Sequence, residues 1–213
     1  MHSPSVESFG NYRAYNCDLL GNHDVSMLSG LGGYFSLAGN SNLTGITHTA
    51  STIVFTTYEA QNCNLTGNHD VSMLSSLGGE FNIHNNINLT GITHSASSEI
   101  FSGYYVFDCN LTGDLYLPFS GLGGEFRGYS NSGLTSITHY GGNVVFTQYW
   151  GHRCDLTGTH DISMLNGLGG SVRLYTNPNL TNILFPYSTE TFANNGGGAG
   201  NRAFSLYGCD LGY

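Results

Sequence analysis

Histidine stands directly before aspartate three times in this chain, and such pairs could serve as catalytic dyads or as metal ligands. The pairs are His23-Asp24, His69-Asp70 and His160-Asp161, and further histidines at 48, 94 and 139 end the motif Ile-Thr-His. All of them recur at a constant period, and the corresponding third segment reads Asp114-Leu115-Tyr116. We therefore expect a structural role, in which each imidazole bonds the backbone of the next coil. No pair of carboxylates departs from the repeat in the way that acid–base catalysis of glycan cleavage requires, so we expect no enzyme.

Five cysteines suggest redox or metal chemistry, but their spacing argues against both. They are Cys17, Cys63, Cys109, Cys154 and Cys209, at intervals of 46, 46, 45 and 55 residues. In a stacked coil, neighbours in this series lie two strands apart, roughly 10 Å, whereas a disulfide needs Cα atoms within about 7 Å. The sequence has no Cys-x-x-Cys or His-x-x-x-His pair for zinc. We expect reduced, buried cysteines that pack as small apolar residues, with no metal and no cofactor.

Aromatic residues and arginine gather at positions that the repeat would place on the outer side of strands. Six successive copies carry an aromatic side chain at one such position, and the only tryptophan and three of five arginines lie at neighbouring ones. These residue types supply most binding hot spots. The alternative is that exposed strands favour aromatic residues by propensity alone. We predict a ligand-binding surface made of Arg13, Tyr15, Glu59, Glu80, His84, Tyr105, Phe107, Arg127, Tyr129, Trp150, His152, Arg173, Tyr175 and Tyr207.

A 46-residue repeat must position these side chains. The stretch CDLLGNHDVSMLSGLGGYFSLAGNSNLTGITH at residues 17–48 returns at 63–94, returns eroded from 109 and from 154, and begins again at 209. A fixed period of this length indicates one supersecondary unit stacked on copies of itself. We expect one solenoid domain over residues 1–213, with about nine half-repeats over 9–211 and a glycine-rich loop insertion near 188–202.

Each period contains two half-repeats whose apolar residues alternate. Phe35 and Leu37 precede Asn40 in one half, and Tyr58 and Ala60 precede Cys63 in the other. Alternation puts every second side chain inside, as in a strand, so the copies predict one parallel sheet with about 4.8 Å between strands. Asparagine then forms a ladder that bonds the backbone of adjacent turns, and glycine pairs serve tight bends where a Cβ would clash. These residues are Asn40, Asn86, Asn131 and Asn177, and the glycines 32–33, 78–79, 123–124 and 169–170.

The half-repeat resembles the leucine-rich repeat, with aromatic residues in several leucine positions. The segments Asp-Val-Ser-Met-Leu at 24–28 and 70–74, and Asp-Ile-Ser-Met-Leu at 161–165, are similar to the convex segment of internalin-type bacterial surface repeats. The resemblance implies a leucine-rich-repeat-like solenoid with one parallel β-sheet on its concave face, short extended or 3-10 convex segments and little α-helix. The apolar residues around Leu31 and Phe35 lie one step wider than in that family, so a different β-solenoid is the alternative.

The charge balance excludes some partners. The chain has five basic residues against fourteen carboxylates and no lysine, which gives a net charge of −9. Nucleic-acid binding needs basic side chains that displace counterions, so we expect none. No apolar run reaches the roughly 20 residues of a membrane span, so we expect no membrane insertion.

Aromatic residues at matching outward positions, together with the lack of a recognisable set of catalytic residues, favour a non-enzymatic recognition or adhesion domain. By resemblance, the setting would be a bacterial surface adhesin or a phage tail or receptor-binding protein, hence a virion, extracellular or cell-surface location. The expected partner is a host surface protein or glycan bound by the aromatic concave face. The alternative is a structural spacer or assembly component of a virion or cell-surface appendage. Since stacked coils need covered ends, we also expect other chains or flanking domains there.

Overall fold

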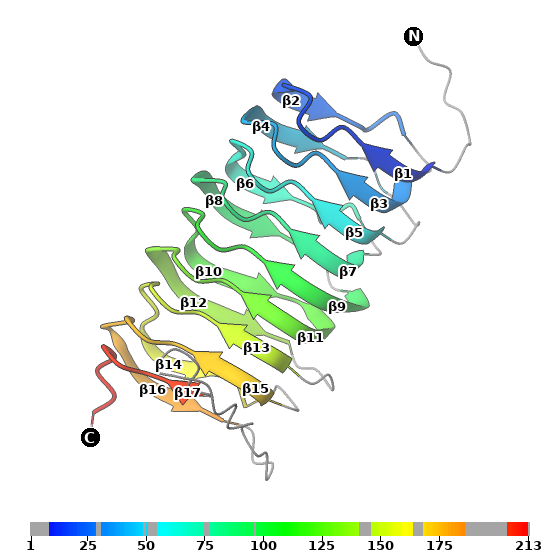
Figure 1. Ribbon diagram of the computed structural model, residues 1–213. Helices are drawn as coiled ribbons and strands as arrows, with labels where there is room; N and C mark the ends of the chain where they lie inside the picture. Colours follow the sequence, from blue (N-terminus) through cyan, green and yellow to red (C-terminus); the bar gives the residue numbers. More distant parts are fainter. Residues whose placement is uncertain are drawn as a thin grey trace.

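The chain folds as a parallel β-solenoid, in which successive coils stack along one axis (Figure 1). The computed structural model describes residues 9–28, 31–48, 50, 55–74, 77–95, 97–140, 146–163, 168–185 and 204–212. These residues contain strands and turns and no helix, so none of them forms a helix able to cross a membrane. The insertion expected near 188–202 lies outside the described residues.

One strand from every coil joins a nine-stranded parallel sheet, whose outer side we call the nine-stranded face. The strands follow one another in the order of the chain. They are β1 (Phe9–Arg13), β3 (Leu31–Ser36), β5 (Phe55–Glu59), β7 (Leu77–Asn82), β9 (Ser97–Tyr105), β11 (Phe119–Arg127), β13 (Phe146–Trp150), β15 (Leu168–Arg173) and β17 (Phe204–Ser205).

A second row of strands, which we call the opposite row, covers the other side of the core. Its strands pair only two by two, as β2–β4, β6–β8, β10–β12 and β14–β16. Their bounds are β2 (Leu20–Asp24), β4 (Asn42–Thr47), β6 (Thr66–Asp70), β8 (Asn88–Thr93), β10 (Thr112–Leu117), β12 (Gly133–His139), β14 (Gly158–Asp161) and β16 (Leu180–Leu184). The segments of the opposite row are thus extended, but they form short ribbons rather than a continuous sheet.

The core lies between the two rows and is built from the alternating residues of the half-repeats. Phe35, Tyr58, Phe81 and Tyr104 are fully buried and occupy matching places in successive strands. Their rings stack with centroids 4.9 to 5.3 Å apart. Because rings of similar size fill the same place in each coil, the strands stay in register along the sheet.

The repeated glycine pairs lie at β-bulges inside the strands, not at bends between them. Gly79 has a φ of +64°, and the register of β7 shifts directly after it. An added Cβ would fall 2.0 Å from the carbonyl oxygen of Thr56 in the preceding coil. The clash expected from the sequence is therefore confirmed, and the extra residue of the bulge accounts for the wide apolar spacing between Leu31 and Phe35.

The asparagine ladder has the role that the sequence predicts. Asn40 is fully buried, and its Oδ1 accepts hydrogen bonds from the backbone N–H groups of Cys17 and Leu19. Its Nδ2 donates to the carbonyl oxygens of Ala14 and Leu37. One side chain thus satisfies four backbone groups in two coils, which offsets the cost of its burial.

Cysteine occupies the same place in alternate coils, and all five thiols are free. The Cys63 thiol donates weakly to the carbonyl oxygen of Leu37, at 3.3 Å, and this oxygen also accepts from Asn40. Burial raises the pKa of the Cys109 and Cys154 thiols to about 12. The predicted burial is confirmed for three cysteines, namely Cys63, Cys109 and Cys154. Cys209 is half-buried and Cys17 is exposed.

Candidate functional site

The register of the nine-stranded sheet aligns the outward side chains that the sequence singles out. Tyr105 of β9 pairs with Arg127 of β11, and Arg127 pairs in turn with Trp150 of β13. We call the whole row the middle column. It consists of Arg13, Ser36, Glu59, Asn82, Tyr105, Arg127, Trp150, Arg173 and Ser205.

Beside the middle column, six aromatic rings form a continuous stack that we call the outer ring ladder. Its members are His84, Phe107, Tyr129, His152, Tyr175 and Tyr207. Neighbouring centroids lie 4.2, 4.6, 4.6, 4.3 and 4.5 Å apart, and the planes are tilted by 9° to 21°. Tyr15 precedes the ladder at the matching place, but Ala38 and Gln61 intervene.

The residue after each ladder position turns the chain into the opposite row. Asn85, Asp108, Ser130, Arg153 and Thr176 all have φ between 50° and 57°. This left-handed conformation is strained for most L-residues. The ladder is therefore fixed by a turn of constant shape on one side and by the strand on the other.

Cations and rings alternate within the middle column. The Arg127 guanidinium lies 5.3 Å from the Tyr105 ring centroid and 4.7 Å from that of Trp150. Arg173 covers the other side of Trp150 at 4.1 Å. Such contacts are worth about 0.5–1 kcal/mol each at exposed places and more when water is excluded. The indole and two guanidinium groups therefore form one preorganised cluster.

Carboxylates and polar groups lock this cluster in place. Arg127 forms an ion pair with Glu125 at 2.7 Å and donates to Oε1 of Gln148. The Trp150 indole N–H donates to Ser171. The Tyr105 hydroxyl donates to Glu125, and burial together with this carboxylate raises the tyrosine pKa to about 12. Glu125, Gln148 and Ser171 stand two residues before the middle-column residues of their strands. None of the three is among the residues that the sequence predicts for the site.

The acidic residues lie toward the N-terminal half of the same face. Glu59 accepts a hydrogen bond from the Tyr34 hydroxyl at 2.6 Å, and the Arg13 guanidinium lies 4.2 Å from the Tyr34 ring centroid. The pKa of Glu80 is raised, chiefly by burial and then by Glu59. The face thus has an acidic part around Glu59 and Glu80 and a part rich in arginine and rings around Arg127.

Exposure differs along the proposed site. Tyr15 and Tyr207 are 57% and 66% exposed, whereas His152 is buried and most other members are half-buried. Because the ladder rings cover one another, they present edges rather than faces to solvent. The expected exposed aromatic surface is therefore a surface of ring edges, with the guanidinium and carboxylate groups beside it.

The histidines of the repeat form a separate, internal cluster. His48 Nε2 lies 2.7 Å from the Tyr58 hydroxyl, and His69 Nε2 lies 2.9 Å from the same oxygen. His139 and His160 hold Tyr149 in the same way. The prediction that imidazoles bond the next coil's backbone was wrong in its partner, because these Nε2 atoms meet a buried phenol. Burial lowers the pKa of His48 to about 3 and of His69 to about 4, so both are neutral.

The aspartates of the histidine–aspartate pairs shape local turns. The Oδ1 atoms of Asp24, Asp70 and Asp161 accept the backbone N–H of Ser26, Ser72 and Ser163, respectively. Neighbouring strand residues point to opposite sides of a sheet. Each imidazole therefore points inward while its aspartate is exposed, which separates the two halves of a would-be dyad. Among the described residues, no group of three or more histidine, cysteine or acidic side chains could hold a metal.

Comparisons of this chain with models of protein families, with curated proteins and with solved structures found no match.

Proposed function

We propose that this chain is a non-enzymatic recognition domain whose nine-stranded face binds another protein. The observation that carries the proposal is the packing of Arg127, Trp150 and Arg173 into one cluster held by ion-pair and hydrogen-bond partners. Tryptophan, tyrosine and arginine dominate binding hot spots. Because neighbouring groups already hold these side chains in place, binding a partner would cost little further side-chain entropy.

The orientation of the rings favours a protein over a glycan on this face. A sugar ring stacks on an open aromatic face, and the outer ring ladder covers its internal faces at 4.2 to 4.6 Å. Ring edges carry partial positive charge, and they suit carbonyl and carboxylate oxygens. The arginine-rich part adds charged donors for the same groups, and Glu59 and Glu80 supply acceptors for a basic part of the partner.

The cellular setting belongs to the proposal as well. The resemblance to internalin-type leucine-rich repeats supports a bacterial surface adhesin or a phage tail component, located on a cell surface or a virion. A host surface protein is the corresponding partner. The alternative is a spacer in a virion or surface appendage, for which a straight stack of coils (Figure 1) would provide length.

Binding of protein-coated fluorescent beads to a panel of bacterial and animal cells tests the proposal. We expect binding to at least one cell type, and loss of that binding after protease treatment of the cells. Replacing Trp150 or Tyr129 with alanine should reduce binding at least tenfold while the midpoint of thermal unfolding stays close to that of the parent chain. Tyr116→Ala is the matched control, because Tyr116 is 49% exposed on the opposite row.

Two results would count against recognition by this face. Unchanged bead binding by Trp150→Ala and Tyr129→Ala would show that the nine-stranded face does not take part in the interaction. Binding that survives protease but not glycosidase treatment would replace the protein partner with a glycan. Normal binding combined with failed self-assembly of the variants would favour the spacer.

A further inference from the structure

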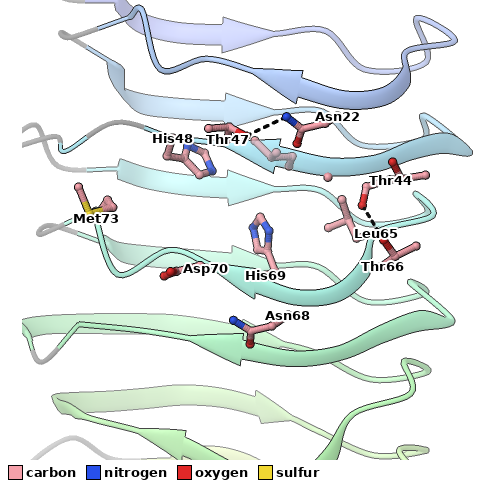
Figure 2. A pocket seen from close by; sticks show the side chains of 12 residues that line it. Asn22, Thr44, Thr47, His48, Leu65, Thr66, Asn68, His69, Asp70 and Met73 are labelled. Atoms are coloured by element: carbon pink, nitrogen blue, oxygen red, sulfur yellow. Dashed lines mark hydrogen bonds between the residues drawn. The ribbon is translucent and has the colours of Figure 1, made fainter.

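Two crevices open on the opposite row, where neighbouring ribbons are not paired. The first lies between β4 and β6 and has a volume of about 310 Å³ (Figure 2). The second lies between β12 and β14 and has a volume of about 170 Å³. Neither is part of the nine-stranded face.

Side-chain clamps within the ribbons β2–β4 and β6–β8, which flank the first crevice, help to explain why it opens between them. Asn22 of β2 donates to the Thr47 hydroxyl of β4 at 2.8 Å, and Asn68 of β6 donates to Thr93 of β8 at 2.9 Å. Across the first crevice, the Thr66 hydroxyl donates to the backbone oxygen of Thr44 at one end (Figure 2), and the Asn64 N–H donates to the Leu43 carbonyl oxygen just before β6. Strands inside a ribbon are thus drawn together, and strands of neighbouring ribbons diverge.

The two crevices are built from equivalent residues. Thr44, His48 and Asp70 line the first, and Thr135, His139 and Asp161 line the second at matching places two full repeats later. From β6 to β14 there are four coils, which corresponds to about 19 Å along the axis. The intervening coil has Leu115 where the other two have His69 and His160. The described part of the chain therefore carries one small site at two matching places, four coils apart.

The lining suits an uncharged ligand rich in hydroxyl groups. Threonine hydroxyls and the Asn68 amide stand at the rim. The exposed Asp70 has its pKa lowered by hydrogen bonds from Ser72, so it is ionised and accepts hydrogen bonds. Deeper in the first crevice, Nδ1 of the neutral His48 is buried without a partner among the described residues. No arginine lies in any strand of the opposite row, so nothing there balances an anionic ligand.

We propose that the two crevices bind separate sugar units of one neutral, linear polysaccharide that runs along the opposite row. A pyranose ring offers neighbouring hydroxyls that can donate to the carboxylate and accept from threonine and asparagine. A short oligosaccharide spans the distance between the crevices. Each crevice alone would bind weakly, and occupation of both by one chain would raise the overall affinity through effective concentration.

Calorimetric titration with neutral oligosaccharides tests this proposal, with cellohexaose, maltohexaose and mannohexaose as the long probes. Their disaccharides serve as short probes, and a hyaluronan hexasaccharide is the anionic comparison. We expect one of the long neutral probes to bind at least tenfold more tightly than its disaccharide, and the anionic probe not to bind.

Bulky substitutions at matching rim positions distinguish binding in the crevices from binding elsewhere on the surface. Thr66→Trp and Thr157→Trp each fill one crevice and should reduce the affinity of the long probe to that of the disaccharide. The double variant should abolish binding. Thr112→Trp is the matched control, because the Thr112 hydroxyl bonds the backbone of Thr90 just as Thr66 bonds that of Thr44, in the coil that carries Leu115.

Several outcomes would overturn the proposal. One is the absence of millimolar or tighter binding for all three neutral probes. Equal affinities of long probe and disaccharide would remove the bridging. A loss with Thr112→Trp as large as with Thr66→Trp would show binding that is not confined to the two crevices. Loss of binding in Trp150→Ala would place the sugar on the nine-stranded face, whereas retention there keeps the two faces independent.

Discussion

The Tyr58 hydroxyl lies 2.9 Å from Nε2 of His69, and His48 approaches the same oxygen from the preceding coil. A hydroxyl has one proton to donate, so one imidazole must accept it and the other must donate its own proton to the phenol oxygen. The accepting ring must therefore be neutral, and burial, which lowers the pKa of both rings, keeps the donating ring neutral as well. This arrangement recurs at Tyr149, whereas at Tyr104 the place of the second histidine belongs to Leu115.

Acid should unfold the solenoid well above the pKa of its carboxylates. Burial lowers the pKa of six histidines in the folded state, to about 3 for His48, His94 and His139 and to about 4 for His69, His152 and His160. Below the ordinary histidine pKa of about 6.5 the unfolded chain binds more protons, so stability falls as the pH falls from there toward 4. At pH 5 each group removes about 2 kcal/mol. Circular dichroism should show a midpoint near pH 5, and a folded chain at pH 4 would contradict this account.

His69→Leu should shift the acid midpoint to lower pH. The substitution copies Leu115, which the chain itself uses at the matching place. At pH 5, His69 binds a proton in the unfolded chain but not in the folded chain, and the substitution removes this difference. At neutral pH the lost hydrogen bond, about 1 kcal/mol, is offset by apolar burial. Urea titrations at pH 7 and pH 5 measure both effects. A variant as acid-sensitive as the parent chain would exclude His69 from the effect.

Two glycines with the same backbone conformation should differ sharply in their tolerance of alanine. Gly79 and Gly67 have φ values of +64° and +66°, but an added Cβ meets the Thr56 carbonyl oxygen at 2.0 Å in one case and nothing within 4 Å in the other. Gly67→Ala should cost only the strain of the left-handed conformation, about 1–2 kcal/mol. Gly79→Ala must also displace a strand and should cost about 3 kcal/mol or more. Equal losses in the free energy of unfolding, measured with denaturant, would show that backbone conformation alone explains the need for glycine at both positions.

Residues whose role depends on period and offset could be predicted from the sequence. Alternation around Phe35 and Tyr58 placed the inward and outward sides of the strands, and the repeat placed Asn86 and Trp150 in columns. These features need only that coils stack in register, which follows from the period itself.

Features that depend on the depth and reach of particular side chains were beyond such reasoning. The partner of His69 was missed because the meeting of its ring with the Tyr58 hydroxyl depends on how far apart the two rows of strands lie. The division of the opposite row into ribbons was missed because it depends on the reach of Asn22 to Thr47. The burial of His152 follows from stacking between neighbouring rings, which the alternation of a single strand does not reveal.

Removing the Asn86 side chain should be among the most damaging polar substitutions. Asn86 is fully buried, accepts from the backbone N–H of Leu65 and donates to the carbonyl oxygens of Ala60 and Ile83. Asn86→Ala leaves the Leu65 N–H and the Ala60 carbonyl oxygen buried without this partner, at about 1–3 kcal/mol each, and leaves the Ile83 oxygen with only the weak bond from the Cys109 thiol. Asn88→Ala is the control, because Asn88 is exposed and bonds only Asn64 among the described residues, so its loss should stay within about 0.5 kcal/mol. Similar losses for both variants in denaturant unfolding would refute the role of the asparagine ladder.

Thr176→Gly should make the protein more stable, although glycine usually weakens a β-structure. Thr176 is exposed and has a φ of 56°, and the matching turn of the next coil carries Gly208 with a φ of 71°. Glycine relieves the left-handed strain of a β-branched residue while keeping the N–H that donates to the Tyr207 carbonyl oxygen, a net gain of about 1 kcal/mol. Thr112→Gly, at the exposed first residue of β10, should instead lose about 0.5–1 kcal/mol. Opposite signs in thermal unfolding support the strained turn, and a loss in both variants would show that Thr176 carries no strain worth relieving.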